Sequence, residues 1–292
     1  MNDLYQAVTE RVVAALEAGT PPWIAPWQDG TAIPSNLATG KPYRGINVLM
    51  LHLEAAARGF PDSRWLTLKQ ANALGARVKR GEHGATVVFF KWKEVGEEAS
   101  EATDETKRVV PMLRAYTVFN ASQVEFLPER FDLGQQPQWH PAAEAETLLR
   151  ESGATIRHGG NRACYLPGED LIQLPPPAWF PEAEGYYATA LHELTHWTGH
   201  SARLNRPLGG RHGIEAYAYE ELVAEMGAAF LCAHCGIPSH LEHAAYIEAW
   251  LAALRHDKRL IFVAAAAAQK AADFVLGTAH VAPSPEAEAL AA

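Results

Sequence analysis

The sequence has few cysteines and no long hydrophobic run. Its three cysteines are Cys164, Cys232 and Cys235, too few for a disulfide scaffold, and we expect them to be reduced thiols. No apolar run approaches the roughly 20 residues that a membrane-spanning helix needs. The chain also begins without the basic region and apolar stretch of a secretory signal. We therefore expect a cytoplasmic protein that does not contact a membrane.

Positive charge is scarce overall but concentrated in one stretch. The 292 residues carry a net charge of −9, with an apolar fraction of 48% that is ordinary for a globular protein. Between residues 33 and 93, however, ten Lys and Arg face three Asp and Glu, a net of +7. A basic stretch in an acidic protein indicates a polyanionic partner. We expect the two parts of the chain to do different work.

The first part, residues 1–130, is expected to be a small α+β domain. Helices are predicted at 4–18 and 46–58, followed by a short helix within 63–75 that has Thr67 as its N-cap. Strands are predicted at 85–93 and 109–120, joined by an acidic segment at 94–107. Residues 131–141, rich in Pro and Gln, are expected to form a linker.

The second part, residues 142–280, has short predicted strands, then His-Glu-Leu-Thr-His at 192–196 and a second helix that carries Glu residues. This is the layout expected of a zincin-like domain with a short sheet and several helices. A helix is predicted at 142–152, and three short strands at 155–157, 163–166 and 171–174. Two Ala-rich helices are predicted at 244–254 and 259–276, and residues 281–292 are expected to form a flexible tail. The fold class predicted for the whole chain is α+β.

Residues 192–196 read His-Glu-Leu-Thr-His, an H-E-x-x-H motif in a segment of helical composition. Residues four apart lie one turn above each other on a helix, so His192 and His196 can give two nitrogen ligands to one Zn²⁺. Glu193 can reach water on that ion as a general base. Apolar neighbours indicate a buried helix, which keeps bulk water away from the site. The motif therefore predicts a zinc site, with another divalent transition metal as the alternative.

Such a site needs a third protein ligand. The metzincin pattern would require a third His at the position of Ala202, so that pattern fails. A following helix offers Glu221 as the ligand and Glu225 as the acceptor that holds the free ring N–H of a ligand His. Glu215 is the fallback ligand. Glu220 is interpreted as a solvated residue of the first helical turn, favoured there by the helix dipole.

The sequence does not assign a single role to several other side chains near the motif. The Cys-x-x-Cys at 232–235 lacks a second pair for a structural zinc, so two core-facing thiols are the better interpretation. Four side chains could stabilise a tetrahedral intermediate, and the sequence does not rank them: His200, His212, Tyr217 and Tyr219.

Aromatic and basic residues recur together in the first part of the chain. Single-stranded nucleic acid is held by a positive groove for the phosphates and by aromatic faces for the bases. The best candidates lie in predicted loops and turns, although each aromatic could equally be a core residue. We expect these residues to bind DNA: Lys41, Tyr43, Arg44, Arg64, Lys79 and Arg80.

Residues 23–27 (Trp-Ile-Ala-Pro-Trp), 42–49 and 118–124 resemble the N-terminal domain of ArdC-type antirestriction proteins, which is also found in plasmid TraC-type primases. Residues 192–200, 203–206 and 219–225 resemble the C-terminal metallopeptidase domain of that family. The resemblance implies single-stranded DNA binding and protection of incoming plasmid DNA from host restriction during conjugation. The Glu-x-x-Ala pattern at 221–224 is similar to that of ImmA/IrrE-type zinc peptidases, in which this Glu is the third ligand.

Two functions from different classes follow. The protein either protects DNA by binding it, or it is an active zinc peptidase that cleaves a host protein, such as a restriction component, with the DNA-binding domain serving only to target it. The resemblance does not decide whether hydrolysis is required for protection.

Overall fold

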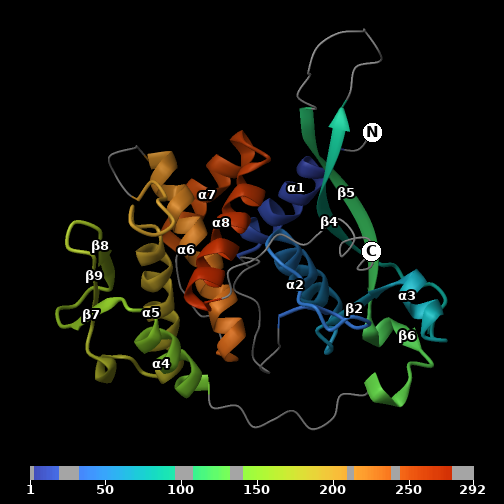
Figure 1. The fold of residues 1–292 in the computed structure, drawn as a ribbon, viewed down its shortest axis with the longest axis horizontal. Coiled ribbons are helices and arrows are strands. Elements are labelled where there is room, and N and C mark those ends of the chain that lie inside the picture. Colours follow the sequence, from blue (N-terminus) through green and yellow to red (C-terminus); the bar gives the residue numbers. More distant parts are fainter. Residues whose placement is uncertain are drawn as a thin grey trace.

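The structure is a computed structural model that describes residues 3–19, 33–95, 108–131, 141–208, 214–237 and 244–277. Most of the predicted acidic segment, the predicted linker and the predicted tail lie outside these residues. Within the described part, no helix combines the length and apolarity needed to cross a membrane. The described residues form helices together with small, mainly antiparallel sheets (Figure 1), which confirms the α+β class.

A four-stranded sheet organises the first part of the chain. Its order is β1 (Ser35–Asn36), β2 (Arg64–Thr67), β5 (Arg108–Asn120) and β4 (Ala85–Val95), and only the β1–β2 pair is parallel. The long β4–β5 hairpin stands at one side of the molecule (Figure 1). Beside it, β3 (Arg77–Val78) and β6 (Val124–Glu125) form a two-stranded sheet.

Three helices accompany this sheet. Helix α1 (Leu4–Glu17) is capped by Asp3 and buries Val8, Val12 and Leu16 at four-residue spacing. Helix α2 (Ile46–Arg58) packs on β4, where the Asn47 amide bonds both backbone groups of Val88 at 2.7 and 2.8 Å. Short helix α3 (Leu68–Ala73) has Thr67 as its N-cap in a capping box, as predicted. Strand β2 ends at this N-cap, in residues for which the sequence predicted no strand.

The second part places helices beside a three-stranded sheet in the order β7 (Thr155–His158), β9 (Leu171–Leu174), β8 (Cys164–Leu166). The helices are α4 (Pro141–Glu151), α5 (Ala183–Thr198), α6 (Ile214–Cys235), α7 (Ala244–His256) and α8 (Leu260–Val275). Helix α6 packs against α5, α7 and α8, so it is covered on several sides. Because α6 is buried on several sides, most of its side chains are apolar.

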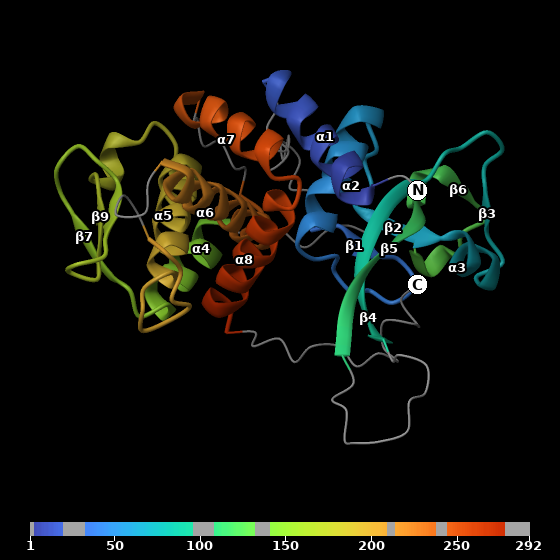
Figure 2. The same cartoon turned by 90° about the horizontal axis from the view of Figure 1, so that it is seen from above.

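The two parts of the chain share one hydrophobic core. Helix α1 packs on α7 and α2 packs on α8, and Figure 2 shows the N-terminal helices against the helices of the second part. The Thr9 hydroxyl donates a 2.8 Å hydrogen bond to the carbonyl of Lys258. The domain boundaries 1–130 and 142–280 remain a prediction. The described residues of the two parts pack directly against each other, so a linker is not their only connection.

Candidate metal centre

Helix α5 presents the two histidines of the H-E-x-x-H motif side by side. His192 is buried and His196 is half-buried, and their ring centroids lie 4.8 Å apart. Apolar residues around them pack against the core, so the imidazoles are held in fixed directions. The helical spacing therefore produces the convergence that the sequence predicted.

Helix α6 brings a carboxylate to both rings. The Oε2 atom of Glu221 lies 3.7 Å from Nε2 of His192, and its Oε1 atom lies 3.5 Å from Nε2 of His196. One ligand atom from each of the three residues falls within 4.8 Å of the others. Two imidazole nitrogens and a carboxylate oxygen form a donor set that suits a divalent transition metal. These residues fit a metal ion in position as well as in chemistry.

The electrostatics of the site favour a cation. Burial alone would raise the pKa of Glu221, but hydrogen bonds and the charge of His192 and His196 hold that pKa below its usual value. Burial opposes a positive charge on His196, yet the Glu220 hydrogen bond and the nearby carboxylates raise the pKa of His196. The site is thus a buried region of negative potential.

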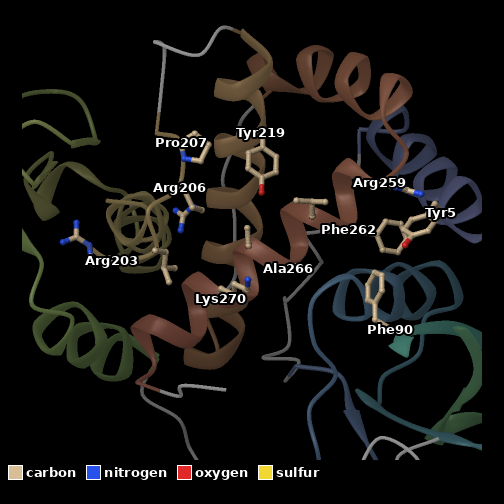
Figure 3. Close-up of a pocket in the computed structure, with 13 residues that line it drawn as sticks. Tyr5, Phe90, Arg203, Arg206, Pro207, Tyr219, Arg259, Phe262, Ala266 and Lys270 are labelled. Atoms are coloured by element: carbon tan, nitrogen blue, oxygen red, sulfur yellow. The ribbon is translucent and has the colours of Figure 1, made fainter. Parts of the chain in front are cut away.

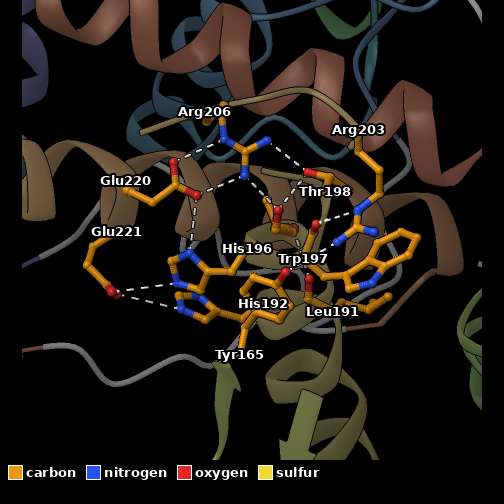
Figure 4. A network of polar contacts seen from close by, with 11 residues as sticks. Tyr165, Leu191, His192, His196, Trp197, Thr198, Arg203, Arg206, Glu220 and Glu221 are labelled. Carbon is orange, nitrogen blue, oxygen red and sulfur yellow. Dashed lines mark hydrogen bonds and ion pairs between the residues drawn. The ribbon is translucent and has the colours of Figure 1, made fainter. Parts of the chain in front are cut away.

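Glu220 corrects the interpretation drawn from the sequence. It is 3% exposed rather than solvated, and its Oε1 atom lies 3.2 Å from Nδ1 of His196. Because α6 begins at Ile214, Glu220 lies in its second turn and points into the interior. Arg206 binds both carboxylate oxygens of Glu220, at 3.0 and 2.8 Å. Figure 4 shows this chain of contacts from Arg206 to Glu221.

The segment after α5 folds back over the end of that helix. Arg206 also donates to the Thr195 carbonyl at 2.7 Å, and Arg203 donates to the Trp197 carbonyl at 2.7 Å. These bonds satisfy carbonyls that the helix terminus leaves without partners. A Cβ at Gly199 would come within 2.5 Å of a Leu208 methyl group and 2.9 Å of the Arg206 guanidinium, so a larger residue here would displace both side chains of the returning segment. Arg203 and Arg206 therefore hold the C-terminal end of α5, the helix that carries His192 and His196, in place.

The remaining residues predicted around the metal take different positions. Glu193 is buried next to the ligands on α5. Oε1 of Glu225 lies 3.9 Å from Nδ1 of His192, close to the predicted contact but beyond hydrogen-bond distance. Tyr217, which is 39% exposed, contributes a hydrogen bond that helps to lower the pKa of Glu221. The side chains of Glu215 and His212 lie outside the described part.

The predicted DNA-binding residues are spread over several elements. Tyr43 is buried in the core, so its ring is not exposed for base stacking, contrary to the expectation from its loop position. Arg44 pairs with Asp273 on α8, and Arg64 pairs with Asp62 at 2.7 Å. Lys79 donates to the Ser122 carbonyl at 2.7 Å while remaining exposed. Lys41 and Arg80 are exposed and form no ion pair with another described residue.

Cys232 and Cys235 are fully buried free thiols, as the core interpretation predicted. Burial raises the pKa of both thiols, that of Cys235 to about 12. Neither is a thiolate ligand in this environment.

Comparisons with known proteins cover both parts of the chain. Residues 2–119 match the model of the N-terminal domain of anti-restriction factor ArdC, and residues 143–267 match that of a zincin-like metallopeptidase. The metal-free crystal structure of the ArdC protein from plasmid R388 superimposes with a TM-score of 0.82 at 44% identity, covering 94% of this chain and 97% of that one. The chain belongs to the ArdC family of antirestriction proteins.

The other relatives agree with membership of the ArdC family. The Mn(II)-bound crystal structure of R388 ArdC gives a TM-score of 0.77 at 45% identity, over 96% of this chain and 100% of that one. Protein y4eC of Sinorhizobium fredii is 41% identical over 94% of this chain and 92% of its own length. DNA primase TraC of Escherichia coli is 44% identical over 93% of this chain, which spans only 27% of that protein. The resemblance to ArdC-type proteins is thereby confirmed, and so is the zincin-like fold of the second part.

Proposed function

We propose that this chain is an antirestriction protein that binds single-stranded DNA and holds a divalent metal ion, Zn²⁺ in the first instance, between His192, His196 and Glu221. The observation that carries the proposal is the convergence of these three donor groups within 4.8 Å. The Mn(II)-bound state of R388 ArdC supports a divalent ion in this family. Imidazole ligands favour zinc, which also binds such sites more tightly than manganese.

The residues of the site have distinct roles in this proposal. A bound zinc ion would supply Lewis acidity that polarises a carbonyl group and lowers the pKa of water. Glu193 would take the proton from the attacking water, and the Tyr217 hydroxyl, which hydrogen-bonds to Glu221, would turn to donate to a developing oxyanion. Glu225 and Glu220 orient the two ligand rings from behind. The site thus has the groups that peptide hydrolysis requires.

The binding of single-stranded DNA accounts for the charge asymmetry of the chain. Lys79 and Arg80 follow β3 in an exposed turn, and Lys41 is exposed near β1. Relatives that include an antirestriction protein and a primase are proteins that act on DNA. Protection of incoming DNA during conjugation needs a protein that reaches the DNA while it is single-stranded.

The metal assignment is tested by metal analysis of purified variants. We expect the wild-type protein to bind one Zn²⁺ per chain and Mn²⁺ more weakly, as measured by isothermal titration. Glu221→Ala should lose most of the bound zinc, whereas Glu184→Ala, a change in the first turn of α5 about two turns before His192, should retain it. Full zinc retention in Glu221→Ala would transfer the third ligand to Glu215.

The role of hydrolysis is tested separately with Glu193→Ala. This variant should keep its metal and its affinity for single-stranded DNA. If it still protects a conjugating plasmid from restriction, DNA binding carries the function. A complete loss of protection with unchanged DNA affinity would favour the alternative, a zinc peptidase that cleaves a host protein.

A further inference from the structure

A groove of about 700 Å³ runs along one face of α8, outside the metal centre. It combines side chains from α1 and β4 with side chains from α6, α8 and the segment after α5. Figure 3 shows Tyr5, Phe90 and Phe262 gathered at one end and Arg206, Pro207 and Tyr219 at the other, with Lys270 and Ala266 on the helix between them. Both parts of the chain therefore build this groove.

The charges that line the groove are of one sign. Among the described residues, its lining includes four cations and no Asp or Glu: Arg203, Arg206, Arg259 and Lys270. Arg203 and Arg206 are neutralised by Asp170 and Glu220. Arg259 and Lys270 are exposed, and within the described part of the chain neither forms an ion pair. These two positive charges attract an anion to the groove.

Apolar side chains are left exposed beside these charges. Phe90 is 43% exposed and Val263 is 53% exposed, although each lies next to a packed core. The guanidinium of Arg259 lies 5.3 Å from the centre of the Tyr5 ring, so a cation and a ring are in contact at this end of the groove. An exposed ring, here Phe90, together with cations that form no ion pair is the combination that holds single-stranded nucleic acid.

The length of the groove suits several nucleotides. Arg259, Val263, Ala266 and Lys270 recur every three or four residues and therefore share one face of α8. At 1.5 Å per residue, the distance from Arg259 to Lys270 is about 16 Å along the helix. That distance corresponds to about five stacked nucleotides at roughly 3.4 Å each.

We infer that this groove binds single-stranded DNA, with Arg259 and Lys270 contacting phosphates and Phe90 stacking on a base. The inference rests on the proposed function. It assigns the main DNA contacts to the groove between the two parts of the chain, and not to the basic turn at 79–80. An acidic peptide would use the two cations but would gain little from the exposed ring. Because Arg206 lines the groove and also binds Glu220, a bound strand lies against the residues that orient His196.

The test measures fluorescence anisotropy of a labelled 20-nucleotide oligothymidylate with the full chain, over a range of salt concentrations. Arg259→Ala/Lys270→Ala should weaken binding at least tenfold and flatten the salt slope by about 1.4, since each lost phosphate contact on a single strand contributes about 0.7. Phe90→Ala should weaken binding severalfold with an unchanged slope. The folding of each variant is checked by circular dichroism and metal content.

The controls are residues that do not line the groove. Arg150→Ala/Arg157→Ala removes two exposed cations from α4 and β7, and Trp179→Ala removes a ring that is 64% exposed. Both should bind as the wild type does. If Arg259→Ala/Lys270→Ala bound single-stranded DNA with unchanged affinity and Lys79→Ala/Arg80→Ala lost affinity, the groove would not be the binding site. The proposed function would stand. A wild-type protein that binds no single-stranded DNA would overturn both.

Polyglutamate serves as a competitor in the same assay. If it displaced the oligonucleotide at equal charge concentration and Phe90→Ala bound normally, the groove would be a general anion site. That result would also overturn the inference.

Discussion

Nδ1 of His196 lies 3.2 Å from Oε1 of Glu220, while Nε2 of the same ring lies 3.5 Å from Oε1 of Glu221. Two consecutive residues of α6 therefore contact opposite edges of one imidazole. The hydrogen bond to Glu220 fixes the tautomer in which Nε2 carries the free lone pair. Arg206 in turn keeps Glu220 charged and in place, and the pKa of Glu220 lies below its usual value even though burial would raise it.

Removing the charge of Glu220 should weaken metal binding. Glu220→Gln keeps the size of the side chain but loses the anionic acceptor, and we expect the zinc affinity to fall by about tenfold to 100-fold. The affinity is measured by competition with a chromophoric chelator. Glu184→Gln, a change in the first turn of α5, serves as the control and should bind zinc normally. Equal affinities in the two variants would exclude an orienting role for Glu220.

The distance between α5 and α6 depends on a glycine. A Cβ at Gly227 would come within 2.5 Å of Cγ2 of Thr195, so Gly227→Ala should destabilise the fold by about 1 to 3 kcal/mol. Urea denaturation measures this free energy. On α5, a Cβ at Gly185 would make only an ordinary van der Waals contact with the Phe180 ring, at 3.9 Å, and Gly185→Ala should stabilise the helix by up to about 1 kcal/mol.

A second substitution checks that the clash is the cause. Thr195→Ala removes the two atoms nearest to the added Cβ, at the cost of its hydrogen bond to Leu191. The double variant Thr195→Ala/Gly227→Ala should therefore lose less stability than the two single changes together. Strict additivity would mean that Gly227 is needed for another reason.

His52 on α2 should make stability depend on pH. Burial lowers the pKa of His52 from 6.5 to about 3, so the unfolded chain takes up this proton at a higher pH than the folded chain. Stability from this group is complete above pH 6.5 and is lost as the pH falls towards 3, by about 1.4 kcal/mol per pH unit. His52→Gln, which does not titrate, should flatten the pH dependence of the free energy of unfolding between pH 6.5 and 4. An unchanged slope in that variant would assign the acid sensitivity to other groups.

The sequence predicted those features that local periodicity determines. His192 and His196 converge because a helix brings residues four apart onto one face, and Thr67 caps α3 because its hydroxyl reaches a neighbouring amide. Strand β2 was missed because four residues are too short to show alternation, and its partner β5 lies some 50 residues further on. Glu220 was misread for a related reason. Its partner Arg206 reaches it only through the return of the segment after Gly199, which no local pattern reports.

The Arg44 guanidinium connects the two parts of the chain, and we expect this role for it in place of the DNA contact that its loop position suggested. Its guanidinium pairs with Asp273, which is 12% exposed, and the Gly45 amide donates to Gln269 at 3.0 Å. Arg44→Ala leaves a largely buried carboxylate without this cation, so we expect a loss of about 1 to 2 kcal/mol in the free energy of unfolding. Affinity for single-stranded DNA should stay within twofold of the wild type.

Arg80→Ala is the matched control for this prediction. Arg80 is exposed and forms no ion pair with another described residue, so its removal should leave stability unchanged within about 0.5 kcal/mol. Asp273→Asn combined with Arg44→Ala completes a double-mutant cycle, and a coupling free energy near zero would contradict the pairing. Arg44→Ala could instead weaken DNA binding strongly without lowering the free energy of unfolding. In that case the Arg44 guanidinium of the wild type would have to give up its pairing with Asp273 and contact DNA in the complex.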